Sequence, residues 1–105
     1  MSDPVATRKA FGEALALAGE KLKNLVVVDA DLTTSVMTHF FEKKFPDRHF
    51  NMGISEQDMV DTAAGMAMAG KLPVACSFAI FLTGLAWQQI RNGVCYPNLN
   101  VKFFG

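Results

Sequence analysis

The chain has 105 residues, which is enough for one compact domain with a core and too few for two independent domains. Ten basic and ten acidic side chains give a formal net charge of zero, so the positive surface that attracts nucleic acid is not expected. Apolar residues make up 50% of the chain and charged residues 19%, a composition that excludes disorder and predicts an apolar surface for a partner.

The sequence carries no sign of export or of a metal site. Residues 1–4 contain no basic segment followed by an apolar stretch, and no run approaches the roughly 18 apolar residues that a membrane span needs. Cys76 and Cys95 lack metal-site spacing and are expected to be reduced thiols. His39 and His49 each lack a nearby second ligand. We therefore expect a cytoplasmic protein that binds no metal itself and has neither a membrane nor nucleic acid as a partner.

The first predicted helix begins with Asp3 as N-cap and Pro4 at the first helical position, and it ends near Asn24. Its apolar residues recur at helical spacing. They are Phe11, Ala14, Leu15, Ala18 and Leu22. The uninterrupted apolar run at 25–28 follows at once, and such a β-branched run is typical of a strand covered on both faces. This strand leads into a polar segment at 29–35.

The remaining segments continue the alternation of helix and strand. They are a helix at 35–45, a strand at 49–52, a helix from Ser55 to Gly70, a strand at 73–77, a turn and helix at 78–96, and a strand at 100–104. In the helix after Ser55, that serine is the expected N-cap, Asp58 its capping-box partner and Gly70 the C′ residue. Alternating strands and helices predict right-handed crossovers and a doubly wound open parallel sheet with helices on both faces.

The fourth predicted helix contains an apolar stripe of Trp87, Ile90 and Val94, which we interpret as structural. Arg91 is expected to pair with an acid of a neighbouring element. The final strand is apolar and has no helix after it in this sequence, which predicts either a covering partner or a domain that is incomplete at its C-terminus.

Glu56 is the candidate functional group, because it is a carboxylate in the first turn of a helix that is otherwise small and apolar. The alternative is that it only stabilises the helix dipole, a contribution of roughly 0.3 to 1 kcal/mol. In an open parallel sheet, ligands bind beyond the carboxyl ends of the strands, where the loops at 29–35, 53–56 and 77–81 are all expected. Phe78 and Phe81 can present adjacent rings there, or can pack in the core.

The chain lacks the sequence motifs of several common sites. The chain has neither a Gly-x-Gly-x-x-Gly nor a Walker pattern, which disfavours a backbone phosphate cradle. It also lacks a Gly-x-Ser-x-Gly elbow, and no histidine is placed to activate Ser55 or Ser77 as a nucleophile.

Six stretches together resemble one family, in the right order and over nearly the whole chain. They are Thr7 to Leu15, Asp29 to Leu32, Phe45 to Arg48, Asn51 to Gln57, Ser77 to Phe81 and Ala86 to Arg91. The chain is similar to the pyrimidine-binding domain of transketolases, and most similar to the separate C-terminal subunit of split transketolases. This resemblance implies that residues 1–105 form one such domain.

The resemblance implies thiamine diphosphate as the cofactor and assigns roles to several residues. Glu56 matches the glutamate that shares a proton with N1′ of the aminopyrimidine, which favours the imino tautomer whose exocyclic nitrogen deprotonates the thiazolium carbon. Phe78 and Phe81 match the aromatic wall of the pyrimidine pocket, and Asp31 with Leu32 matches the loop beside the cofactor. Two further residues, Arg8 and Ser35, match positions that contact the phosphate of a sugar substrate.

The chain departs from the family pattern at Leu85, where arginine is usual, and at Asp58, where asparagine is common. It contains no Gly-Asp-Gly motif for metal and diphosphate. The resemblance therefore implies that an N-terminal transketolase subunit supplies the diphosphate site with Mg²⁺ or Ca²⁺, in a homo- or hetero-oligomer. The isolated chain is then expected to be inactive.

The expected reaction is transfer of a two-carbon ketol unit between sugar phosphates, as in the pentose phosphate reactions. Two alternatives stay open. One is a related thiamine enzyme, such as a deoxyxylulose phosphate synthase or a 2-oxo acid dehydrogenase β subunit, although the stretches at 77–81 and 86–91 favour transketolase. The other is a non-catalytic α/β module that keeps the fold and the interface.

Overall fold

A computed structural model describes residues 3–105 and contains one four-stranded parallel sheet in the order β2-β1-β3-β4. The strands are β1 (Leu25–Asp29), β2 (His49–Asn51), β3 (Leu72–Cys76) and β4 (Lys102–Phe104). The helices are α1 (Thr7–Lys21), α2 (His39–Lys44), α3 (Glu56–Met68) and α4 (Trp87–Gln89), with a 3₁₀ turn at Pro46–Arg48 and π-helical segments at Phe81–Leu85 and Ile90–Cys95.

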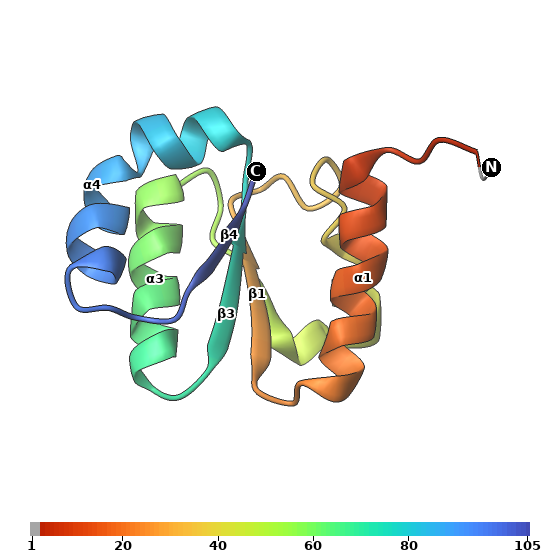
Figure 1. Cartoon of the computed structure of the whole chain (residues 1–105), viewed down its shortest axis with the longest axis horizontal. Helices are drawn as coiled ribbons and strands as arrows, with labels where there is room; N and C mark the ends of the chain where they lie inside the picture. The colour runs from red at the N-terminus through yellow and green to blue at the C-terminus, as the bar shows by residue number, and fades with distance from the viewer. Residues whose placement is uncertain (1–2) are drawn as a thin grey trace.

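Helices cover both faces of the sheet, as predicted (Figure 1). Phe41 of α2 and Leu15 of α1 pack with Val27 on one face, while Met59 and Val60 of α3 pack with neighbouring strand residues on the other. Val27 and Val28 are fully buried because each contributes its side chain to a different one of these two cores. The doubly wound parallel architecture is therefore confirmed.

The carboxyl ends of the strands are aligned. Asp29 is the register partner of Asn51 on one side and of Cys76 on the other, and Cys76 is the partner of Phe104. The loops that follow β1, β2 and β3 consequently leave the sheet at one edge. This is the edge where an open parallel sheet offers space for a ligand.

The first helix begins later than predicted, at Thr7 with Ala6 as the N-cap, so the prediction of Asp3 as N-cap is wrong. Residues 3–6 are exposed and lie outside the helix, since they have no core to pack against. Within α1, Leu15 is buried as expected. Ala14 and Leu22 are exposed.

The predicted helix at 35–45 is also shorter, because residues 33–38 form turns and α2 starts at His39. Met37 has a left-handed backbone with φ of 63°, which no right-handed helix can contain. Phe41 is fully buried, as its apolar pattern indicated, and α2 ends before Pro46.

Helix α3 starts and ends where the sequence indicated, although its first turn lacks the predicted capping hydrogen bonds. Ser55 occupies the N-cap position, but its side chain forms no capping hydrogen bond, so the predicted capping box with Asp58 is wrong. At the other end, Gly70 has φ of 94° and donates its N–H to the carbonyl of Ala67 at 3.1 Å. Lys71 donates to Met66 at 3.0 Å, which completes a Schellman motif.

The long helix predicted at 78–96 is interrupted by two wide π turns on either side of α4. In the first, Ala86 donates to the carbonyl of Phe81, five residues earlier, and the extra residue rotates the following segment. Ala86 is therefore buried, while Trp87 is 55% exposed and does not share a buried stripe with Ile90 and Val94. Ile90 and Val94 do pack against the core.

Arg91 does not form the predicted ion pair within the described chain. Its guanidinium lies 5.5 Å from the centre of the Trp87 ring, in a cation–π contact. None of the helices among residues 3–105 combines the length and the apolar character that a membrane crossing requires.

Candidate functional site

Glu56 is the first residue of α3 and lies at the carboxyl edge of the sheet. Its side chain is largely buried, with 9% of the residue exposed, and it lines a pocket of about 230 Å³ with Ile54, Ser55, Gln57 and Leu85. Within residues 3–105, neither a hydrogen bond nor an ion pair joins its carboxyl group to another side chain. A carboxyl group this buried and this free of protein partners is available to a ligand.

The N-terminal end of α3 is held to the π-helical segment by one side chain. The Nε2 of Gln57 donates to the carbonyl of Leu85 at 2.9 Å. Leu85 is 54% exposed beside the pocket of Glu56. The chain therefore presents an apolar rim here rather than a cation.

Asn51 connects the loop after β1 to the loop that leads into α3. Its Oδ1 accepts hydrogen bonds from the backbone N–H groups of Asp31 and Gly53, both at 2.9 Å, and its Nδ2 donates to Oδ1 of Asp31 at 3.1 Å. Asp31 has φ of 62° and Gly53 has φ of 75°, so these bonds hold two left-handed turns. Sequence reasoning missed Asn51, although its place at the end of a predicted strand was a usable signal.

Asp31 and Leu32, predicted to lie beside a cofactor, differ in environment. Asp31 is exposed and engaged with Asn51. Leu32 is half-buried and packs against the core on the α1 side of the sheet. The structure therefore places both residues at the carboxyl edge, with Asp31 exposed and Leu32 partly covered.

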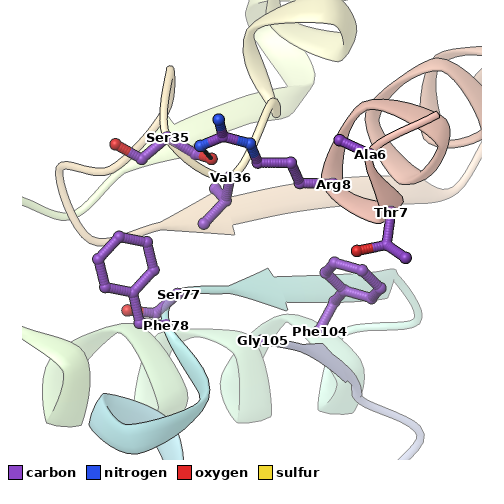
Figure 2. Close-up of a pocket in the computed structure, with 9 residues that line it drawn as sticks. All are labelled: Ala6, Thr7, Arg8, Ser35, Val36, Ser77, Phe78, Phe104 and Gly105. Atoms are coloured by element: carbon purple, nitrogen blue, oxygen red, sulfur yellow. Dashed lines mark hydrogen bonds between the residues drawn. The ribbon is translucent and has the colours of Figure 1, made fainter. Parts of the chain in front are cut away.

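A second pocket, of about 360 Å³, lies between the start of α1 and the ends of β3 and β4 (Figure 2). Arg8, Ser35 and Phe78 all line it. Figure 2 shows Arg8 extending from α1 toward the loop that carries Ser35, and its Nη1 donates to the backbone carbonyl of Ser35 at 3.4 Å. The structure thus brings together the two residues that were predicted to contact a phosphate.

Phe78 and Phe81 form a stacked pair, with ring centroids 5.6 Å apart and planes inclined by 29°. Phe78 is 43% exposed and lines the pocket with Arg8, so it does not pack in the core. Phe81 is half-buried behind it. Glu56 lines the other pocket, so the structure does not gather the predicted site residues in one cavity. Asp31, Leu32 and Phe81 line neither of these two pockets.

A buried polar network lies beneath this edge, and sequence reasoning missed it. Asp29 is fully buried, and its Oδ2 lies 2.7 Å from Oγ1 of Thr38 and 2.7 Å from Nε2 of His49. The other ring nitrogen of His49 lies 3.1 Å from Oε2 of Glu42. Burial acts to raise the pKa of Asp29, but hydrogen bonds from His49 and Thr38 outweigh it and hold the pKa below its ordinary value.

The cysteines differ in exposure, and both are free thiols. Cys76 is buried beside Asp29, and burial together with that carboxylate raises the pKa of its thiol far above the ordinary value. Cys95 is exposed. No cluster of three or more metal-ligating side chains occurs in the part of the chain that the structure describes.

Comparison with known proteins gives a family match over residues 3–105, to the family described as "Transketolase, pyrimidine binding domain". A "Putative transketolase C-terminal section" from Methanocaldococcus jannaschii is 54% identical over 95 residues, which cover 90% of this chain and 30% of that protein. One subunit of an apulose-4-phosphate transketolase from Actinobacillus succinogenes is 49% identical over 82 residues, covering 78% of this chain and 26% of that protein.

Solved structures agree with these relatives. A structure described as "Split gene transketolase, inactive beta4 tetramer" superposes with a TM-score of 0.87 at 50% identity, over 96% of this chain and 34% of that one. The chain therefore spans about a third or less of the length of these relatives.

Proposed function

Because the chain belongs to the family of transketolase pyrimidine-binding domains, we propose that it supplies the pyrimidine half of a thiamine diphosphate site. The enzyme it serves transfers a two-carbon ketol unit between sugar phosphates. The observation that carries this proposal is Glu56, a largely buried carboxyl group at the carboxyl edge of the sheet without a protein partner among residues 3–105.

The residues at this edge fit the aminopyrimidine. Glu56 offers an oxygen that can share a proton with the ring nitrogen N1′. The other residues that line its pocket are uncharged. Phe78 and Phe81 offer a stacked aromatic surface to the flat ring. Asp31 and Leu32 would lie on the loop beside the cofactor, with Asp31 held in place by Asn51.

Thiamine diphosphate, when bound, supplies the nucleophilic carbon that attacks the carbonyl group of a ketose donor. Glu56 would hold and share the proton at N1′ of the bound cofactor, which would make the exocyclic amino group a better base. The apolar residues Ile54 and Leu85 at the rim exclude water from that proton once a partner covers them.

Arg8 and Ser35 are proposed to bind the phosphate group of a sugar substrate. The Arg8 guanidinium is a planar donor that suits a phosphate, and Ser35 lines the same pocket of about 360 Å³. The hydrogen bond from Arg8 to the Ser35 carbonyl already aligns the two residues.

The diphosphate group and its Mg²⁺ or Ca²⁺ are proposed to lie on an N-terminal subunit, in a homo- or hetero-oligomer of the cytoplasm. Relatives whose names denote a C-terminal section and a transketolase subunit support this division. A similar split-gene protein was solved as an inactive β4 tetramer, which supports the expectation that this chain is inactive without its partner.

The test is turnover after the chain is mixed with its N-terminal subunit, thiamine diphosphate and magnesium. We expect ketol transfer that falls at least about 100-fold in Glu56→Gln, because the shared proton at N1′ is lost. The matched control is Asp58→Asn, which removes another acid from the first turn of α3 and should change the rate less than about threefold.

Two results would contradict the proposal, and a third would change the reaction. Equal losses in Glu56→Gln and Asp58→Asn would assign Glu56 to helix stabilisation alone. Association with the partner without any thiamine-dependent turnover would favour the non-catalytic module. Turnover with pyruvate as donor and glyceraldehyde 3-phosphate as acceptor, but with no ketose donor, would favour a deoxyxylulose phosphate synthase.

A further inference from the structure

The loop between β1 and α2 carries Ser35 and Val36 into the pocket that Arg8 also lines. Asp31 and Met37 of this loop have left-handed backbones, with φ of 62° and 63°. Residues other than glycine rarely adopt this conformation. The shape of the loop is therefore not one that its residues prefer by themselves. Contacts from the rest of the fold must hold it.

Helix α1 holds the loop from one side. A Cβ atom on Gly12 would clash with the carbonyl oxygen of Met37 and would lie 2.8 Å from the Phe40 ring, so α1 passes closer to the loop than any other residue type allows. Arg8 adds its hydrogen bond to the Ser35 carbonyl from the same helix.

Asp29 holds the loop from beneath. Oγ1 of Thr38 donates to Oδ2 of Asp29 at 2.7 Å, and it also lies 3.3 Å from the carbonyl of Thr33. The backbone N–H of His39 donates to that same carbonyl at 3.3 Å. Thr33 and Thr38 bracket Ser35, so this buried junction closes the loop at its base.

His49 orients the carboxylate that makes the junction. Its Nε2 lies 2.7 Å from the same Oδ2, and its Nδ1 lies 3.1 Å from Glu42 of α2, so a carboxylate lies beside each nitrogen of the imidazole ring. Cys76 packs beside Asp29 as its partner in β3. Oδ1 of Asp29 is buried without a hydrogen-bond partner in the described chain, so every bond of this carboxylate serves the loop or His49.

We infer that Asp29, Thr38 and His49 are positioning residues that hold the 33–37 loop in the shape that places Ser35 beside Arg8 for a phosphorylated substrate. This inference rests on the proposed function for the identity of the ligand. The part of the inference that concerns the ordering of the loop is independent of the proposed function. None of the three residues lines the pocket, so they act through Ser35.

The experiment compares Thr38→Val, Thr38→Ser and the control Thr62→Val in the full chain and in its complex with the N-terminal subunit. Thr38→Val keeps the shape of the side chain and removes the hydroxyl donor, Thr38→Ser keeps the donor, and Thr62→Val makes the same change on α3, away from the loop. Two measurements are made: amide hydrogen exchange at 33–37, and KM and kcat with ribose 5-phosphate and with unphosphorylated ribose as acceptors.

In Thr38→Val we expect exchange at 33–37 to become at least about tenfold faster while amides of α3 keep their rates. KM for ribose 5-phosphate should rise about tenfold, with kcat and the KM for ribose within about twofold of wild type. Thr38→Ser should return the exchange rates and the KM for ribose 5-phosphate most of the way to their wild-type values. Thr62→Val should change neither quantity.

Unchanged exchange at 33–37 in Thr38→Val overturns the inference, whatever the enzyme assays show. Equal rises in KM for both acceptors also overturn it, because the effect is then general and not directed at phosphate. A wild-type complex without any turnover refutes the proposed function, and the exchange measurement then decides the positioning role by itself.

Discussion

At the scale of single residues, the side chains of this site form two groups. One group lines the pockets, and the other fixes the loops that carry the pocket residues. Glu56, Arg8 and Phe78 line pockets at the sheet edge. Asn51, which is exposed, and Asp29, which is buried, line neither pocket and fix the loops. Local sequence patterns indicated Glu56 and Phe78, and the family resemblance indicated Arg8. The second group depends on contacts between residues far apart in sequence.

Asp29 and His49 illustrate this limit. They are 20 residues apart, and their side chains meet only because β1 and β2 pair in parallel in one register. A strand register is a property of the sheet, and a slip of one residue would turn His49 to the opposite face. His49 was therefore interpreted as an isolated residue when it is the buried partner of a carboxylate.

The lowered pKa of Asp29 predicts how stability depends on pH. Because the folded pKa is below the ordinary value of 3.8, the bonds to His49 and Thr38 contribute stability above that pH, and this contribution is lost as pH falls through the folded pKa. We expect Asp29→Asn to lose about 2 kcal/mol of unfolding free energy at pH 7.

Urea unfolding of wild type and variant between about pH 7 and pH 2 measures this effect, and the difference between them should shrink toward the acid end. Glu20→Gln is the control, since Glu20 pairs with Lys44 on the surface, where solvent screens the pair. A difference between wild type and Asp29→Asn that stays constant over the whole range would contradict the predicted linkage.

At the scale of elements, the sequence predicted which segments are helices and strands better than it predicted how they begin and continue. The apolar run at 25–28 and the small-residue helix from Glu56 to Met68 were both correct, because burial on both faces and helical period are local signals. The break in the helix at 78–96 was missed, since the π turns leave no clear pattern in composition.

The C-terminus of α3 offers a direct test of an element boundary. Gly70 has φ of 94°, a backbone that a side chain strains, while Gly65 lies inside the helix with open space where a Cβ would be. Gly70→Ala should therefore lose about 1 to 2 kcal/mol of unfolding free energy. Gly65→Ala should gain about 0.5 to 1 kcal/mol through helix propensity.

Urea unfolding at neutral pH measures both variants under one condition. The opposite signs of the two changes in unfolding free energy matter more than their sizes, because each substitution adds one methyl group near the same end of α3. Equal effects of the two substitutions would mean that the Schellman geometry at Gly70 does not determine where α3 ends.

At the scale of the whole molecule, the fold brings three loops to one edge of a parallel sheet and leaves apolar residues exposed there. Ile54 is 84% exposed and Leu85 54%, and both border the pocket of Glu56. Such a rim is costly in water and is suited to a covering partner. This surface therefore supports the proposal that the site is completed between two polypeptides.

The shared proton of Glu56 is central to the chemistry proposed for the complete site. Sequence reasoning placed this glutamate at the first turn of α3, and the structure adds that it is largely buried and without a protein partner in the described chain. Its contact with a pyrimidine nitrogen is a proposal about the assembled enzyme. It is best tested on the cofactor itself.

The most direct measurement is the rate at which the thiazolium C2 proton of bound thiamine diphosphate exchanges with deuterium in the assembled complex. We predict a fall of at least about 100-fold in Glu56→Gln, with less than about threefold change in Asp58→Asn. An exchange rate in Glu56→Gln equal to that of the wild-type complex, with the cofactor fully bound, would contradict this role of Glu56.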